Sequence, residues 1–460
     1  MKKHVKDVSY TTLNQFVTLG ILFLITVVIA RLYGVSELGV YASWSALGQM
    51  VSGLFMFGFD ASILRQISFL SGKKDRDSIQ KLASSAVFFF LGFGLLIFWF
   101  LIPLSWLPVD IPANLALLLC LFAYFRVLNA IPSSILIGLE RFKEQALLNI
   151  SSQVIIFSSL FFVSSFEQFF YFLAFTPLFL FVVRIILIRE YLRLHFDLKK
   201  VISLFSFAKY IGLTSLFKLF YAKVDILLVT LFLGTATTGL YSAGISIANL
   251  LTLVPVAVGT VMTPLLSRYA GESNMKKTKG VLLVTTRYLA VSSFLSALGL
   301  LLLARPLISL LYGEAFIVVE TFLPLLIIAA MLTVFTTVAK PLFWAYNKPH
   351  ISMWAWLMCT ICILPLDLVF IPLLGVYGAS IVRVLFMTLM FFVMGYNIYK
   401  LIGREYVETV LKILVVMIPV VTLSFFGVLF LFIGAIIFLI LMIVLNVVHL
   451  SELRMIFGGK

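Results

Sequence analysis

Long apolar runs follow one another along almost the whole chain, and short polar segments separate them. Many of these runs are long enough to form a transmembrane helix, because a helix of about 18 residues or more can cross a hydrocarbon core of about 30 Å. A transmembrane β-barrel would instead show segments of about ten residues in which polar and apolar positions alternate. The runs therefore predict an all-α, polytopic membrane protein.

The composition agrees with this class. Apolar residues make up 62% of the 460 residues and charged residues 12%, compared with about 25% charged residues in soluble proteins. A formal charge of +15 is also typical of nucleic-acid-binding proteins, but the basic residues fall mainly in loops between apolar runs. There they are typical of a topology signal and of attraction to anionic headgroups. We therefore predict membrane lipids, and no nucleic acid, as partners.

The apolar runs predict fourteen transmembrane helices. Two pseudo-symmetric six-helix lobes, residues 1–200 and 201–400, would be followed by an additional helix pair in residues 401–460. The expected spans lie near residues 13–31, 39–60, 83–102, 113–138, 146–165, 168–188, 209–233, 239–264, 284–304, 316–339, 350–372, 376–396, 411–428 and 430–449.

The loops give the orientation. Those on one side carry 27 of the 34 basic residues, including Arg287 at the start of its span, whereas the other side has only Arg31 and Arg305. Basic residues concentrate in cytoplasmic loops, and a miscounted span would exchange the sides of every later loop. We expect both termini to be cytoplasmic.

A short motif occurs twice, two hundred residues apart. Gly34-Val-Ser-Glu-Leu-Gly39-Val-Tyr41 and Gly234-Thr-Ala-Thr-Thr-Gly239-Leu-Tyr241 share two glycines and a tyrosine in the same register. Each copy connects an odd-numbered span to the next even-numbered one. Glycine suits such a turn because it tolerates a positive φ. The repeat predicts two related lobes, as in many transporters.

The sequence offers no catalytic or metal-binding constellation. Cys359 and Cys362 have the spacing of half a zinc or redox site, but the chain has no second pair. A phosphate-binding loop for nucleotide hydrolysis is absent as well. We predict that the chain is not an enzyme and has no cofactor and no metal site.

Charged residues inside the expected spans are the candidate functional residues. A charge at the bilayer centre costs about 2.5–3.5 kcal/mol on insertion scales and usually faces a wet or protein-lined interior. Arg184 lies near the inner end of its span, where its side chain can reach the interface. The other basic residues are Arg126, Lys218, Lys223 and Arg383, and the acidic residues are Asp60, Asp225 and Asp367.

Two interpretations of these charges are open. In the first, they line a central water-filled cavity that binds a phosphate-bearing or acidic substrate. In the second, they form internal charge pairs that fasten helices together, with Lys218 and Asp225 as one such pair on one helix face. The excess of basic residues favours an anionic cargo.

Six short motifs occur in a characteristic order over about residues 5–400. They are Arg31-Leu-Tyr-Gly34 with Gly39-Val-Tyr41, Lys223-Val-Asp225, Pro264-Leu-Leu-Ser-Arg268, Leu311-Tyr-Gly-Glu-Ala-Phe316, Ala345-Tyr-Asn-Lys-Pro349 and Gly375-Val-Tyr-Gly-Ala379. In this order and spacing the chain resembles the polysaccharide-biosynthesis flippases, the oligosaccharide branch of the multidrug/oligosaccharidyl-lipid/polysaccharide exporter superfamily.

The resemblance implies two six-helix bundles around a cavity that opens alternately to the two sides of the membrane. The implied cargo is a polyprenyl-diphosphate-linked oligosaccharide, and other polysaccharide assembly proteins are further expected partners. By the resemblance, Arg31 and Asp225 fall at positions that are commonly polar in the family.

We expect five cations to bind the substrate: Arg31, Arg126, Lys218, Lys223 and Arg383. We expect any coupling to an ion gradient to use Asp60, Asp225 or Asp367.

Two alternatives remain. A multidrug or organic-cation antiporter of the same fold would need acidic rather than basic residues in its cavity. A membrane-embedded saccharide polymerase would generally need a large outer loop or a soluble domain, and the expected outer loops are short.

Overall fold

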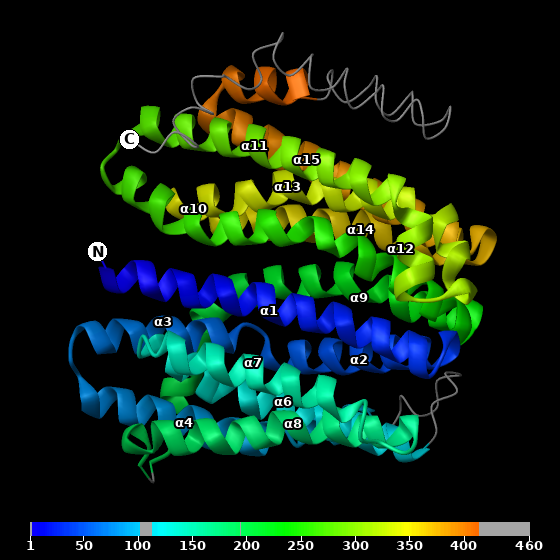
Figure 1. Ribbon diagram of the computed structural model, residues 1–460. Helices are drawn as coiled ribbons and strands as arrows, with labels where there is room; N and C mark the ends of the chain where they lie inside the picture. Colours follow the sequence, from blue (N-terminus) through cyan, green and yellow to red (C-terminus); the bar gives the residue numbers. More distant parts are fainter. Residues whose placement is uncertain (1, 102–112, 194, 414–460) are drawn as a thin grey trace. The chain divides into compact units, whose positions relative to one another are not determined.

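The computed structural model describes residues 2–101, 113–193 and 195–413, and over these residues it consists of helices and turns without any strand (Figure 1). The helices are α1 (Lys2–Leu32), α2 (Val35–Met56), α3 (Phe59–Gly72), α4 (Arg76–Phe93), α5 (Leu96–Leu101), α6 (Ala113–Gly138), α7 (Phe142–Ser159), α8 (Phe166–Ile188), η2 (Arg189–Tyr191), α9 (Leu198–Asn249), η3 (Leu250–Thr252), α10 (Leu253–Gly271), α11 (Met275–Leu302), α12 (Ala304–Leu311), η4 (Glu314–Thr321), α13 (Leu323–Ala345), α14 (Pro349–Leu374) and α15 (Val376–Ile402). Residues 404–413 are also helical.

The expected helical membrane protein is confirmed, whereas the count of fourteen spans is not. Nine helices in the described part of the chain are long and apolar enough to cross a membrane, or ten if α2 and α3 count as one bent span. The bend between α2 and α3 is 50° and follows from two consecutive residues with positive φ, Phe57 and Gly58. The two expected spans near residues 411–428 and 430–449 fall almost entirely outside the described residues.

By the contacts among their residues, the described helices form two compact units. The first takes in Met1–Ala243 and Trp356–Ala379, and the second takes in Gly244–Ala355 and Ser380–Lys460 as far as these are described. This division follows packing rather than the sequence repeat. The expected lobes, residues 1–200 and 201–400, therefore stay a prediction.

In the first unit, α6 is the central helix. It packs along α8, α3 and α2, while α1 packs along α7, and Figure 1 shows α6, α7 and α8 side by side. Between α3, α4 and α6 the core is fully buried and apolar, with Ile63, Ile67, Phe90 and Ala123 at 0% exposure. The α4 residues in this core run from Ile79 to Phe90 and include both alanines and large apolar side chains.

In the second unit, α13 packs between α10 and α11. Gly259 of α10 lies so close to α13 that a Cβ at this position would be 2.9 Å from Thr337 Cγ2. The Tyr346 hydroxyl bonds Thr278 Oγ1 of α11 at 3.1 Å. The helical residues 404–413 are joined to α11 by an ion pair of 3.7 Å between Lys279 and Glu405.

The two copies of the repeated motif both form the expected turn. Gly34, between α1 and α2, has a φ of 98°, and Gly234 has a φ of 81° and divides α9 into two arms. We call residues 198–233 the first arm and residues 235–249 the second arm. The structure confirms that each copy needs glycine at its first position, because other residues are strained at positive φ.

Buried polar side chains hold the two arms of α9 together. The Tyr241 hydroxyl donates to Asp225 Oδ2 at 2.7 Å, and Asp225 Oδ1 accepts from the backbone N–H of Ile226 at 2.8 Å. Thr230 and Thr238 bond each other at 3.0 Å. These hydrogen bonds join the two arms and fix the turn at Gly234.

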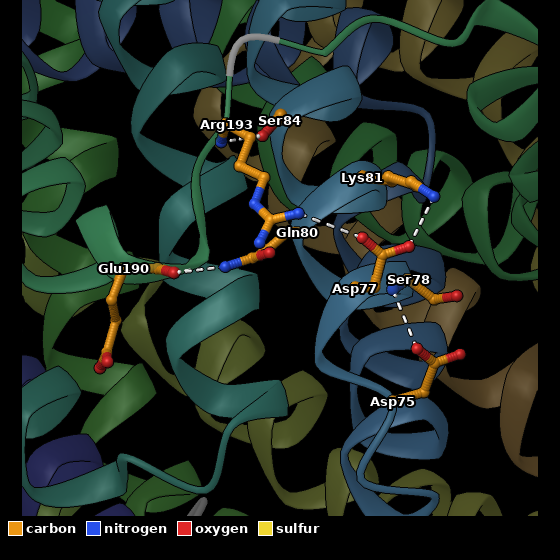
Figure 2. A network of polar contacts seen from close by, with 8 residues as sticks. All are labelled: Asp75, Asp77, Ser78, Gln80, Lys81, Ser84, Glu190 and Arg193. Atoms are coloured by element: carbon orange, nitrogen blue, oxygen red, sulfur yellow. Dashed lines mark hydrogen bonds and ion pairs between the residues drawn. The ribbon is translucent and has the colours of Figure 1, made fainter.

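The connection between α8 and α9 is bound along the N-terminal half of α4. We call residues 189–193 and 195–197 the linker strap. Figure 2 shows Gln80 Nε2 donating to the Glu190 carbonyl at 2.8 Å, and the Arg193 N–H donating to Ser84 Oγ at 2.7 Å. One residue further along α4, Ser85 Oγ accepts from the N–H of Asp197 at 2.9 Å. Buried side chains of α4 thus satisfy the backbone of an irregular segment.

Exposed charges surround these bonds (Figure 2). Asp77 pairs with both Lys81 and Arg193. Asp75 caps α4 by accepting from the Ser78 N–H at 3.0 Å, and hydrogen bonds from the Ser78 side chain and backbone hold the pKa of Asp75 below its ordinary value. Because these ion pairs are exposed, they contribute little to stability compared with the buried bonds.

Candidate functional site

A close helix crossing positions α2, the helix on which the candidate site depends. Where α2 meets the second arm of α9, a Cβ on Gly39 would lie 1.8 Å from the Thr235 carbonyl oxygen. Ser36 and Thr235 share a hydrogen bond of 3.0 Å at the same crossing. The first turns of the two repeated motifs are therefore in backbone contact.

Further along, α2 contacts two of the predicted cations or their neighbours. Ser52 Oγ accepts from Arg126 Nε of α6 at 3.4 Å. The next residue, Gly53, lies against the first arm of α9, since a Cβ there would be 2.3 Å from Leu219 Cδ2. Leu219 directly follows Lys218, so two consecutive α2 residues lie between the helix segments that carry Arg126 and Lys218.

Arg126 occupies the middle of α6, and its side chain is exposed. Its guanidinium lies 5.4 Å from the centre of the Phe122 ring, and the phenol of Tyr41 is near enough to interact with it electrostatically. Ser52, Phe122 and Tyr41, its neighbours in the described residues, carry no carboxylate. Arg126 is therefore a positive group about 20 Å from either end of a membrane-crossing helix, without an acidic partner there.

The Phe122 ring that supports Arg126 is itself fixed. A Cβ on Gly48 would be 2.5 Å from this ring, and the buried Trp44 ring lies 4.8 Å from it. Trp44 is held in turn by a hydrogen bond from Nε1 to the Leu115 carbonyl at 3.1 Å. The apolar side of the site is thus rigidly packed, which favours one orientation of the guanidinium.

Lys218 lies near the middle of the first arm of α9 and is exposed. Its ammonium makes no hydrogen bond or ion pair with other residues in the ranges that the structure describes. The considered pair between Lys218 and Asp225 is not formed. Two helical turns, about 10.5 Å, separate the residues, and the Asp225 carboxylate is occupied by Tyr241 and the Ile226 backbone.

The expectation that Arg184 reaches the membrane interface is wrong, because this side chain is only 1% exposed. Its Nε donates to Gln145 Oε1 at 3.2 Å and its Nη2 to Asn149 Oδ1 at 2.7 Å, both on α7. Its Nη1 donates to Asn129 Oδ1 of α6. Amide oxygens of two neighbouring helices take the place of water, so the guanidinium stays inside the bundle.

The predicted acids lie in different surroundings. Asp225 is buried at 6% exposure in the polar contacts between the arms of α9. Asp60 is exposed in the first turn of α3, after the bend that follows α2, where the helix N-terminus favours a negative charge. Asp367 is half-buried in α14 between Pro365 and Pro372.

The other predicted cations lie on α1, α9 and α15. Arg31 is exposed in the last turn of α1, just before the turn at Gly34. Lys223 is half-buried in the first arm of α9. Arg383 is half-buried in α15 and belongs to the second unit, whereas the others belong to the first.

One of the 27 basic residues that are counted with the loops lies inside a helix. Arg287 is half-buried and lies well inside α11, roughly three helical turns after the helix begins. The helix begins earlier than hydropathy indicates because Asn274 caps it, accepting from the Lys277 N–H at 3.1 Å. An asparagine followed by a helix-forming segment is a recognisable start signal and would have identified this position.

The chain matches known proteins at the level of family and fold. The model of a family described as polysaccharide biosynthesis protein matches residues 28–320. A probable flippase of Haloferax volcanii, AglR, is 27% identical over 193 residues, which are 41% of this chain and 40% of that protein. A probable low-salt glycan biosynthesis flippase of the same organism, Agl15, is 21% identical over 190 residues, with the same coverage. The chain spans about two fifths of the length of these curated relatives.

Solved structures show the fold. The lipid II flippase MurJ in an inward closed conformation is similar with a TM-score of 0.71 at 17% identity, covering 95% of this chain and 98% of that one. An inward-facing multidrug resistance MATE transporter of the MOP superfamily follows with 0.62 at 16% identity, covering 84% and 95%. The chain therefore has the fold of these transporters and is a multi-pass membrane protein, and the similar proteins are flippases and transporters rather than enzymes.

Proposed function

The chain belongs to the polysaccharide biosynthesis protein family, and on that premise we propose that it is a flippase. Its cargo is a polyprenyl-diphosphate-linked oligosaccharide, which it moves across a prokaryotic plasma (inner) membrane by alternating access for cell-surface polysaccharide assembly. The names of the two Haloferax relatives and of the MurJ structure support a flippase of lipid-linked glycans.

The observation that carries this proposal is the position of Arg126. It is an exposed cation at the middle of a membrane-crossing helix, and its neighbours in the described residues are hydroxyl groups and an aromatic ring. Exposure of such a charge to lipid would be expensive, so the surface around it faces a hydrated cavity. A guanidinium there offsets the desolvation of a diphosphate, which it can bind with two parallel hydrogen bonds.

Lys218 supports the same substrate class. Its ammonium is exposed and makes no ion pair in the described residues, and α2 connects its segment to that of Arg126. Two positive groups without carboxylate partners favour an anion between or beside them. We assign Arg126 and Lys218 to diphosphate binding, with Lys223, Arg31 and Arg383 as further cations of the proposed cavity.

In this proposal, the acidic residues couple transport to its driving force. Asp60, Asp225 and Asp367 are the candidates for coupling substrate movement to an ion gradient. Of these, Asp60 has an exposed carboxylate at a helix N-terminus and makes no ion pair within the described ranges. Both termini and the linker strap lie on the cytoplasmic side.

A multidrug or organic-cation antiporter of the same fold is not favoured. A cationic drug would be repelled by Arg126 and Lys218, which no carboxylate neutralises in the part of the chain that is described. The sequence relatives named above are also flippases rather than drug transporters.

Binding of a polyprenyl diphosphate by purified protein tests the proposal. Farnesyl diphosphate and the neutral farnesol are compared on the unaltered protein and on the variants Arg126→Ala, Arg126→Lys and Lys143→Ala. We expect Arg126→Ala to bind the diphosphate about 10- to 100-fold more weakly and to stop surface polysaccharide export. The variant Lys143→Ala, which removes an exposed cation, should bind normally. Equal affinity for farnesyl diphosphate and farnesol would refute the proposed substrate class.

A further inference from the structure

Two charged side chains are buried in the described part of the chain, Asp225 and Arg184. Asp225 belongs to the contacts that close the turn in α9. Arg184 takes no part in the binding of cargo described above. It lies between α6, α7 and α8, away from any exposed surface, and its charge has no assigned purpose.

We propose, on the basis of the proposed flippase function, that Arg184 is a positioning charge for the diphosphate site. It acts through Arg126, without touching the cargo. Its fixed positive charge strengthens the attraction of that part of the bundle for the anionic headgroup.

The contacts of Arg184 satisfy its hydrogen bonds but leave its charge unbalanced. The three acceptors are the amide oxygens of Gln145, Asn149 and Asn129. No carboxylate bonds Arg184 within the described residues. A buried charge is costly in a low-dielectric interior even when it is hydrogen-bonded, and a neutral side chain could fasten the same helices. The unbalanced charge therefore points to an electrostatic role.

The acceptor on α6 connects this charge to the candidate site. Asn129 lies three residues after Arg126, about 4.5 Å along the helix and about 60° around it. The two guanidiniums therefore act on the same part of the bundle, one exposed and one buried. Both guanidiniums are positively charged, so an anion bound at Arg126 is attracted by both.

The buried charge is held rigidly. Gln145 Nε2 donates to Ser133 Oγ at 2.6 Å and to Asn149 Oδ1 at 3.3 Å. These bonds fix the amide groups that surround Arg184, so the charge does not move when the cargo arrives. Fixed charges of this kind stabilise an anion without any cost of reorientation at the moment of binding.

The size of the effect follows from Coulomb's law. With an effective dielectric constant of about 20, a fixed charge on the order of 10 Å away changes the affinity for a single negative charge by about 10-fold. Salt reduces the effect where solvent reaches the site.

Three variants separate the charge from the structural bonds. Arg184→Gln removes the charge and keeps an amide that can bond the surrounding oxygens. Arg184→Lys keeps the charge. Gln145→Glu keeps Arg184 and neutralises it with an adjacent carboxylate, which makes a buried ion pair and is expected to preserve the fold.

Binding of farnesyl diphosphate and farnesol is measured for each variant at low and high salt, together with the melting temperature in detergent. We expect Arg184→Gln and Gln145→Glu to bind the diphosphate about 10-fold more weakly at low salt, with a smaller difference at high salt. Arg184→Lys should stay within about twofold of the unaltered protein, and farnesol binding should not change in any of them.

A folded Gln145→Glu variant with unchanged diphosphate affinity overturns the proposal, even if Arg184→Gln fails to fold. If Arg126→Ala weakens diphosphate binding as expected while Gln145→Glu does not, only the role of Arg184 is wrong. If the unaltered protein does not prefer the diphosphate to farnesol, the proposed function fails, and the role of Arg184 fails with it.

Discussion

Gly39 and Gly239, two hundred residues apart in the chain, lie back to back where α2 crosses the second arm of α9. A Cβ on Gly39 would be 1.8 Å from the Thr235 carbonyl oxygen, and a Cβ on Gly239 would be 1.9 Å from the Val35 carbonyl oxygen. The relation is reciprocal, as expected when two copies of one motif meet around an approximate two-fold axis. Backbones in such contact leave no room for any side chain at either position.

The crossing predicts a strong effect of one methyl group. Gly39→Ala and Gly239→Ala should each lower the melting temperature of the purified protein, because a rigid carbonyl must move to admit the Cβ; we expect a loss of about 1–3 kcal/mol or more. Gly20→Ala is the matched control, because nothing lies within 4 Å of the added Cβ. Unchanged melting of Gly39→Ala would show that the helices do not touch at this position.

We expect a substitution of Lys218 to lower activity without lowering stability. Since its ammonium bonds none of the described residues, Lys218→Met removes no interaction and should melt at or above the temperature of the unaltered protein. Export of surface polysaccharide should fall about 10-fold, because the proposed diphosphate site loses one cation. A large drop in melting temperature would instead indicate a structural partner for Lys218.

Tyr241 predicts an energetic link across the turn in α9. Tyr241→Phe leaves the buried Asp225 carboxylate without its hydroxyl donor and should cost about 1–3 kcal/mol of unfolding free energy. Tyr171→Phe, in an exposed ring, should cost nothing. In a double-mutant cycle with Asp225→Asn, the two changes should be non-additive, and additive costs would contradict the bond.

The linker strap predicts slow hydrogen exchange at two backbone amides. The N–H groups of Arg193 and Asp197 donate to Ser84 and Ser85, so the double variant Ser84→Ala, Ser85→Ala should accelerate their exchange about fivefold, as expected when each amide loses a bond worth about 1 kcal/mol. Exchange measured by mass spectrometry reports this directly.

Two control variants show whether the serine hydrogen bonds hold the strap. The exposed Ser68→Ala change should leave the exchange as it is. Asp77→Asn should have a small effect, because it breaks only exposed ion pairs. If Asp77→Asn accelerated exchange as much as the serine changes, the ion pairs rather than the buried bonds would hold the strap.

The fold class followed from the sequence because local rules decide it. Apolar runs define most helices, and positive φ at Gly34 and Gly234 follows from the turn that each copy of the motif must make. Hydropathy does not locate the start of α11, because the first turns of this helix carry lysines. Hydropathy therefore counts Arg287 with the preceding loop. A capping residue rather than an apolar run marks that helix end.

The environment of each charge could be predicted only in part. Arg126 and Lys218 were singled out because a charge within an apolar run is rare. The partners of Arg184 come from two other helices and lie 35 to 55 residues away in the chain. No spacing rule connects positions so far apart, so the choice between an interfacial and a buried arginine depends on tertiary packing.

The linker strap also decides where this polypeptide can be divided. A gene split between residues 197 and 198 would leave the strap covalently attached to α8, with its hydrogen bonds to α4 intact. A split between residues 188 and 189 would detach the segment that Gln80, Ser84 and Ser85 bind. Co-expressed halves of the first kind should reassemble into a working transporter. Halves of the second kind would have to form the hydrogen bonds between the linker strap and α4 across two separate polypeptides.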